Sequence, residues 1–254
     1  MTGAAQVIPG AEPFSSPGGP VGVLVLHGFT GNPSSVRGLA EAFAAAGHTV
    51  ELPRLPGHGT SVEDMLDTGW ADWSAVAEAA YEDLAGRCER VVVAGLSMGG
   101  SLTCWLGTRH QEIAGLICVN PAVAPTEEMR AGVAALVAAG ELVMPGIGSD
   151  IAKPGVVETA YADTPLAPLL TLFEASQEVV ADLGRITSPL LLFTSPEDHV
   201  VPASDSDLLA DAVSGPVERV ACERSYHVAT MDFDAELIEE RSVEFVARVA
   251  VAAS

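Results

Sequence analysis

Basic side chains are scarce in this chain. Its 254 residues include 12 Lys and Arg against 34 Asp and Glu, which gives a formal net charge of −22, and Lys153 is its one lysine. An electrostatic field of this sign repels phosphate backbones and anionic lipid surfaces. The composition therefore argues against nucleic acid as a partner and favours a small, neutral or weakly polar ligand.

Long apolar runs are missing as well. No stretch reaches the roughly 18 consecutive apolar residues of a membrane-spanning helix, so we expect no stable membrane insertion. The first residues, MTGAAQVIPGAEPFSSPGG, lack the basic start and the apolar central run of a signal peptide, and we therefore expect a cytoplasmic protein. Nothing in the sequence specifies an oligomeric state.

The chain also lacks cysteines in a metal-binding spacing. It has four, none of them in a CxxC pair, at Cys88, Cys104, Cys118 and Cys222. Three of the four fall inside apolar segments, where a thiol serves as a small hydrophobic side chain. We expect structural cysteines, no metal ion and no cofactor.

What the sequence does contain is a regular alternation of short apolar runs with longer amphipathic stretches. The runs rich in Val, Leu and Ile are candidate strands, at 21–26, 48–53, 90–95, 114–120, 189–195 and 217–222. Helical periodicity and end signals predict helices from Asn32 to Gly47, over 70–87, directly after Ser97, and over 203–213 and 235–251. This alternation predicts an α/β fold, with a mostly parallel sheet flanked by helices on both faces.

The strand signal disappears over residues 121–185. This segment is apolar and helical in pattern, contains several prolines, and is long for a crossover connection. We interpret the chain as one domain, with a core formed by residues 1–120 and 186–254 and a small helical cap inserted over about 121–185.

The apolar side chains of the inserted segment would suit a lid over an acyl-binding pocket. Val143, Met144 and Ile147 are our candidates for lining such a pocket. The alternative is that these side chains only pack the cap onto the core.

The most specific local motif is Gly95-Leu96-Ser97-Met98-Gly99, which directly follows one predicted strand and directly precedes a helical stretch. A serine at a sharp strand-to-helix turn has a strained backbone, needs small neighbours, and projects its hydroxyl from the carboxyl edge of the sheet. The context predicts that Ser97 is a nucleophile.

A serine becomes a strong nucleophile only when a base takes its proton. In the fold that carries this turn, the chain order is serine, acid and then histidine, each at the carboxyl end of a strand. Of the six histidines, His227 alone satisfies both order and position. The loop SPEDHVVP offers two candidate acids, Glu197 and Asp198.

Ester or amide cleavage also builds negative charge on the former carbonyl oxygen, so backbone N–H donors must already point at it. Met98, next after the nucleophile, supplies one donor. The loop His27-Gly28-Phe29-Thr30-Gly31 follows the first strong strand, where the second donor of this fold resides. We expect Phe29 to supply it.

Five motifs in order, HGFTG, LPGHG, GLSMGG, PEDHVVP and a late histidine before the last helix, resemble the small bacterial carboxylesterases and monoacylglycerol lipases of the α/β-hydrolase superfamily. The resemblance covers nearly the whole chain. It implies a triad of Ser97, Asp198 and His227, because relatives place the acid just before a short segment that ends in a proline, here Pro202. It also implies Phe29 and Met98 as oxyanion donors.

The resemblance implies a serine carboxylic ester hydrolase that forms an acyl-enzyme on Ser97 and takes esters with a single acyl chain. One departure from the family pattern is Tyr226, where relatives usually have glycine before the histidine. The alternatives are other reactions of the same fold, namely a thioesterase, a carbon–carbon bond hydrolase or a cofactor-free haloperoxidase, and a non-enzymatic small-molecule receptor.

Overall fold

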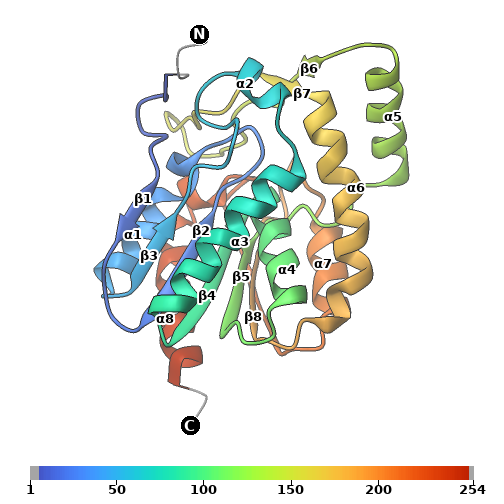
Figure 1. Ribbon diagram of the computed structural model, residues 1–254. Helices are drawn as coiled ribbons and strands as arrows, with labels where there is room; N and C mark the ends of the chain where they lie inside the picture. Colours follow the sequence, from blue (N-terminus) through green and yellow to red (C-terminus); the bar gives the residue numbers. More distant parts are fainter. Residues whose placement is uncertain (1–5, 252–254) are drawn as a thin grey trace.

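A seven-stranded sheet forms the centre of the computed structural model, which describes residues 6–251 (Figure 1). The strand order is β1-β3-β2-β4-β5-β8-β9. Only the edge strand β1 is antiparallel to its neighbour. The strands are β1 (Phe14–Ser16), β2 (Val21–Leu26), β3 (Thr49–Leu52), β4 (Arg90–Leu96), β5 (Gly115–Val119), β8 (Leu190–Thr194) and β9 (Val217–Ala221). All six predicted strands are confirmed to within two residues at each end, and β1 was not predicted.

Helices cover both faces of the sheet. On one face lie α1 (Arg37–Ala45) and α8 (Ala235–Val251), and on the other lie α3 (Trp70–Arg87), α4 (Met98–Arg109) and α7 (Ala203–Ala212) (Figure 1). Successive residues of β2 enter opposite cores, with Val23 and Val25 facing α1 and Leu24 and Leu26 facing α3. Burial on both faces explains why the strands are continuous apolar runs.

Local signals set the ends of several elements. The side chain of Asn32 accepts a hydrogen bond from the N–H of Ser34 and caps the short helix η1 (Pro33–Val36), which leads into α1. Gly47 ends that stretch with a φ of +88°, in the left-handed region that glycine tolerates best. Two further short helices are α2 (Val62–Leu66), capped by Ser61, and η3 (Ala229–Met231). Within residues 6–251, no helix is both long and apolar enough to cross a membrane.

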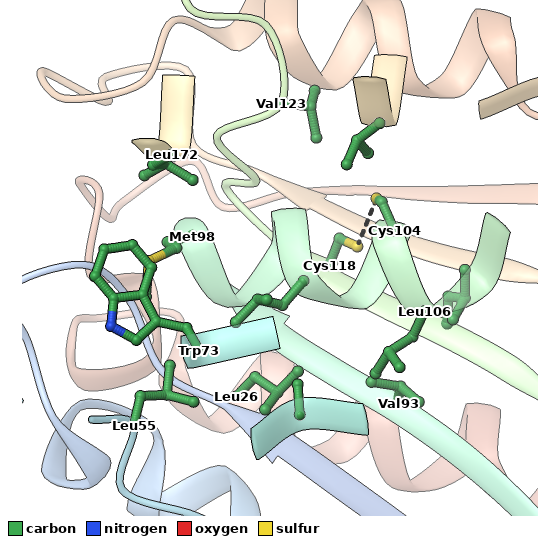
Figure 2. Close-up of a cluster of buried hydrophobic side chains, with 14 of the residues drawn as sticks. Leu26, Leu55, Trp73, Val93, Met98, Cys104, Leu106, Cys118, Val123 and Leu172 are labelled. Carbon is green, nitrogen blue, oxygen red and sulfur yellow. Dashed lines mark hydrogen bonds between the residues drawn. The ribbon is translucent and has the colours of Figure 1, made fainter. Parts of the chain in front are cut away.

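The core between α3, α4 and the sheet packs large side chains beneath the carboxyl end of the strands. Trp73 lies beside Met98 and Leu55 in this layer (Figure 2). Cys104 and Cys118 are also buried here, with their sulfur atoms 3.9 Å apart (Figure 2). These thiols act as the small hydrophobic side chains that the sequence predicts.

Between β5 and β8 the chain leaves the sheet and forms a layer at its carboxyl end (Figure 1). This inserted segment contains α5 (Glu127–Ala138), β6 (Val143–Pro145), β7 (Asp163–Pro165), α6 (Leu166–Asp182) and η2 (Leu183–Arg185). The antiparallel pair β6-β7 was not predicted. Each of its strands has three residues and ends in proline, which is too short for a period-two pattern to show.

Candidate active site

Ser97 sits at the turn between β4 and α4, with a φ of +57°. The two flanking glycines permit this turn because a Cβ on Gly95 would lie 2.1 Å from the carbonyl oxygen of Gly99, and one on Gly99 would lie 2.1 Å from that of Leu26. The side chain of Ser97 borders a cavity at the carboxyl end of the sheet. The strained turn predicted around the nucleophile candidate is therefore present.

His227 and Asp198 meet from two different loops. The Nδ1 atom of His227 lies 2.7 Å from Oδ2 of Asp198, and the two side chains are 8% and 2% exposed. The other carboxylate oxygen of Asp198 accepts the N–H groups of Val200 and Val201, both at 2.8 Å. Glu197 is exposed on the same loop. The structure thus brings Asp198, and not Glu197, to His227, and His227 borders the same cavity as Ser97.

The backbone of His227 is held on both sides. Its N–H donates to Oδ2 of Asp150 at 3.0 Å, and its carbonyl accepts from Nδ2 of Asn120 at 2.8 Å. Tyr226 replaces the usual glycine and has a negative φ. It is not among the non-glycine residues with positive φ in the described part of the chain, which are Thr30, Ser97 and Asn120. Tyrosine is therefore accommodated before the histidine without left-handed strain.

The loop after β2 passes directly against the nucleophile candidate. A Cβ on Gly28 would lie 3.3 Å from Cβ of Ser97, and Phe29 borders the cavity. The ring of Phe29 packs edge-on against Trp73 at 5.6 Å between centroids and against His58 at 6.2 Å. Met98 follows Ser97 directly and buries its side chain in the core (Figure 2). Of the two predicted oxyanion donors, Met98 thus adjoins Ser97 in the chain and Phe29 borders the same cavity as Ser97, and their role stays a prediction.

The side chains of His27 and His58 contact this loop. Nε2 of His27 accepts the N–H of Leu55 at 3.1 Å, and its Nδ1 bonds the carbonyl of Gly28 at 2.9 Å. Burial lowers the pKa of His27 to about 4 and lowers the pKa of His58 well below its ordinary value. Both rings are therefore neutral near pH 7 and fix the loop rather than carry charge.

The cavity has a volume of about 560 Å³ and a mostly apolar wall. Side chains of the inserted segment form much of that wall, among them Val133, Leu136, Met144, Ile147, Leu172 and Phe173. Of the three predicted lining residues, Met144 and Ile147 border the cavity. Val143 does not, which corrects our expectation. It precedes Met144 on β6, where successive side chains point to opposite sides, and it is 36% exposed.

Four acidic residues complete the cavity wall, namely Glu128, Asp150, Glu158 and Asp205, and no Lys or Arg among the described residues borders it. Glu158 is half-buried and accepts a hydrogen bond from the hydroxyl of Ser35. Burial raises the pKa of its carboxyl. Asp205 accepts the N–H groups of Val123 and Ala124 with one oxygen.

Sequence reasoning missed Asp150, Glu158 and Asn120. The two acids stand in a loop without periodicity, so no local pattern distinguishes them from solvated charges. Asn120 carried a usable signal, because it is a polar residue at the carboxyl end of a buried strand, where functional groups gather in parallel sheets.

The parallel sheet, with a serine at its strand-to-helix turn and a His–Asp pair at the same edge, is the architecture of the α/β-hydrolases. Comparison with known proteins agrees, since residues 21–234 match the family described as serine aminopeptidase, S33. The chain belongs to this family and is a serine hydrolase.

Relatives of known name extend over the whole chain. A thermostable monoacylglycerol lipase from Bacillus sp. (strain H-257) is 48% identical over 98% of this chain and 99% of its own length. A carboxylesterase from Bacillus subtilis (strain 168) is 29% identical over 94% and 97%. A solved structure of the metagenome-derived lipolytic enzymes LipS and LipT superposes with a TM-score of 0.92 at 43% identity, covering 96% of this chain and all of that one. The resemblance stated from the motifs is confirmed.

Proposed function

We propose that the protein hydrolyses carboxylic esters with a single acyl chain, and that monoacylglycerols are its natural substrates. The observation that carries this proposal is that Ser97 and His227, whose ring is bonded to Asp198, border one mostly apolar cavity. The name of the relative with 48% identity supports the choice of monoacylglycerol.

The proposed reaction begins when Nε2 of His227 takes the proton of the Ser97 hydroxyl and the oxygen attacks the ester carbonyl. Asp198 holds Nδ1 of the ring at 2.7 Å, which fixes the tautomer and stabilises the imidazolium that forms. The N–H groups of Phe29 and Met98 stabilise the tetrahedral oxyanion. The imidazolium then protonates the departing alcohol, and water releases the acid from Ser97 by the same steps.

The inserted segment supplies the acyl pocket in this proposal, as a cap over the core. Its apolar side chains from α5, β6 and α6 surround the part of the cavity away from the sheet. A volume of about 560 Å³ is that of a single small-molecule site. One acyl chain with its alcohol fits such a space, whereas the three chains of a triacylglycerol exceed it.

The charge of the cavity wall favours an uncharged alcohol. Four acidic residues border the cavity, and within residues 6–251 no Lys or Arg does so, in a chain with a formal net charge of −22. Coenzyme A thioesters carry several phosphates, which such a wall repels. Glycerol is uncharged and meets no such repulsion. The charge therefore favours an ester hydrolase over a thioesterase.

A substrate panel tests the proposal. It comprises p-nitrophenyl esters from acetate to palmitate, monoacylglycerols, emulsified triolein, an acyl-coenzyme A and an aminoacyl p-nitroanilide for the peptidase activity that the family description names. We expect turnover of the p-nitrophenyl esters and monoacylglycerols only. Faster cleavage of the thioester or the anilide than of any monoacylglycerol would contradict the proposal.

A further inference from the structure

Asp150 connects the inserted segment to both catalytic loops. It lies between β6 and β7 and is 9% exposed. Its Oδ2 accepts the N–H of His227 at 3.0 Å and the N–H of His199 at 3.2 Å, and its Oδ1 lies 2.8 Å from Nδ1 of His199. Its own carbonyl accepts the N–H of Val228 at 3.1 Å. One side chain thus holds the base candidate itself and the residue that follows Asp198.

Asp232 makes the reciprocal connection from the loop that carries His227. Its Oδ2 accepts the N–H groups of Ala152 at 2.6 Å and Tyr226 at 3.0 Å, and its Oδ1 accepts that of Lys153 at 2.9 Å. Each of the two loops therefore binds the backbone of the other through a buried carboxylate. Such multiple bonds from one carboxylate fix the geometry of both loops.

The opposite side of His227 is fixed by the sheet. Asn120, at the end of β5, donates to the carbonyl of His227 at 2.8 Å and bonds the N–H of Ser195 through its Oδ1 at 2.8 Å. The sheet thus holds the carbonyl of His227, and the inserted segment holds its N–H. In the proposed mechanism the imidazole must reach Asp198 and Ser97 together, so a shift of this backbone would disturb the approach to both.

We propose that Asp150 is a positioning residue, whose carboxylate sets the separation of the acid and base loops and couples the inserted segment to His227. This proposal rests on the proposed function, because it takes His227 as the base. A displacement of about 1 Å at a reacting group costs about a hundred-fold in rate. Loss of the carboxylate should therefore slow the chemical step and leave substrate binding nearly unchanged.

The test compares Asp150→Ala and Asp150→Asn with the wild-type protein. Three quantities are measured: kcat and KM for p-nitrophenyl butyrate, the rate at which a fluorophosphonate labels Ser97, and the downfield proton NMR signal of the Nδ1–H of His227. We expect Asp150→Ala to lower kcat and the labelling rate by about a hundred-fold, with little change in KM, and to weaken the NMR signal. Asp150→Asn keeps one acceptor oxygen and should restore part of the rate.

Asp234→Asn is the matched control. Asp234 is also buried and accepts bonds from the N–H of Arg224 and the hydroxyl of Ser225 in the same loop, and its hydrogen bonds among the described residues do not include His227. This variant should lose thermal stability and keep the labelling rate and the NMR signal.

The inference is overturned if folded Asp150→Ala, or Asp150→Asn where the alanine variant does not fold, labels as fast as wild type with an unchanged signal. It is also overturned if the control loses labelling to the same degree. Labelling does not depend on the natural substrate, so a wild-type protein that labels at Ser97 but cleaves no ester refutes the proposed function alone.

Discussion

Met144→Trp should shift the acyl-chain preference of the protein toward short acids. Met144 borders the cavity from β6 and is half-buried there. Tryptophan exceeds methionine by roughly two to three methylene volumes, and each buried methylene is worth about 0.8 kcal/mol. A long acyl chain that loses this space loses about 2 kcal/mol of transition-state binding. The ratio of kcat/KM for p-nitrophenyl decanoate to that for butyrate should fall about thirty-fold, since about 1.4 kcal/mol corresponds to tenfold.

The neighbouring residue supplies a matched control for this prediction. Val143 precedes Met144 on the same strand and does not border the cavity. Val143→Trp should therefore leave the ratio of the two kcat/KM values unchanged. Melting temperatures of both variants show whether the inserted segment still folds. Equal changes of the ratio in the two variants, or no change in a stable Met144→Trp protein, would refute our assignment of the acyl pocket.

Three further predictions concern the site. Ser97→Ala should lower kcat by about a million-fold without lowering the melting temperature, and a variant with a tenth of the activity would contradict the nucleophile assignment. Asp198→Asn should cost about 10⁴ in kcat while Glu197→Gln costs little, and the reverse result would shift the acid by one residue. Glu158→Gln should raise the melting temperature at pH 8. Burial raises the pKa of Glu158 in the folded protein, so the wild-type protein loses stability as the pH rises through this raised pKa. The gain in melting temperature should shrink as the pH is lowered toward the ordinary carboxyl pKa. A gain that does not change with pH would refute the raised pKa of Glu158.

The fold was largely predictable because the central strands are buried on both faces. Runs such as residues 21–26 and 90–96 must be continuously apolar to pack against helices above and below the sheet. Strands β1, β6 and β7 were not predicted, because each has only three residues, includes Ser or Pro, and shows no recognisable alternation of apolar and polar residues. Their formation depends on a partner strand far along the chain.

In the site, too, residues placed by long buried strands could be predicted, whereas residues in segments without a local pattern could not. Ser97, Asp198 and His227 lie in the turn or loops that follow β4, β8 and β9, so the order of the sheet alone predicts that they gather at one edge. Asp150 lies 77 residues before His227 and outside any strand. Its contact with the histidine arises from the way the inserted segment folds back onto the core. The exclusion of Val143 from the cavity likewise follows from the pairing of β6 with β7, which no local pattern revealed.

In the proposed mechanism Ser97 carries the acyl group during ester hydrolysis. The most direct measurement mixes the protein with p-nitrophenyl octanoate, quenches it in acid during turnover, and locates the octanoyl group by mass spectrometry of its peptides. We predict one octanoyl group on the peptide that contains Ser97, formed together with a burst of p-nitrophenol. Turnover without an acylated peptide, or with the acyl group on another residue, would contradict the claim.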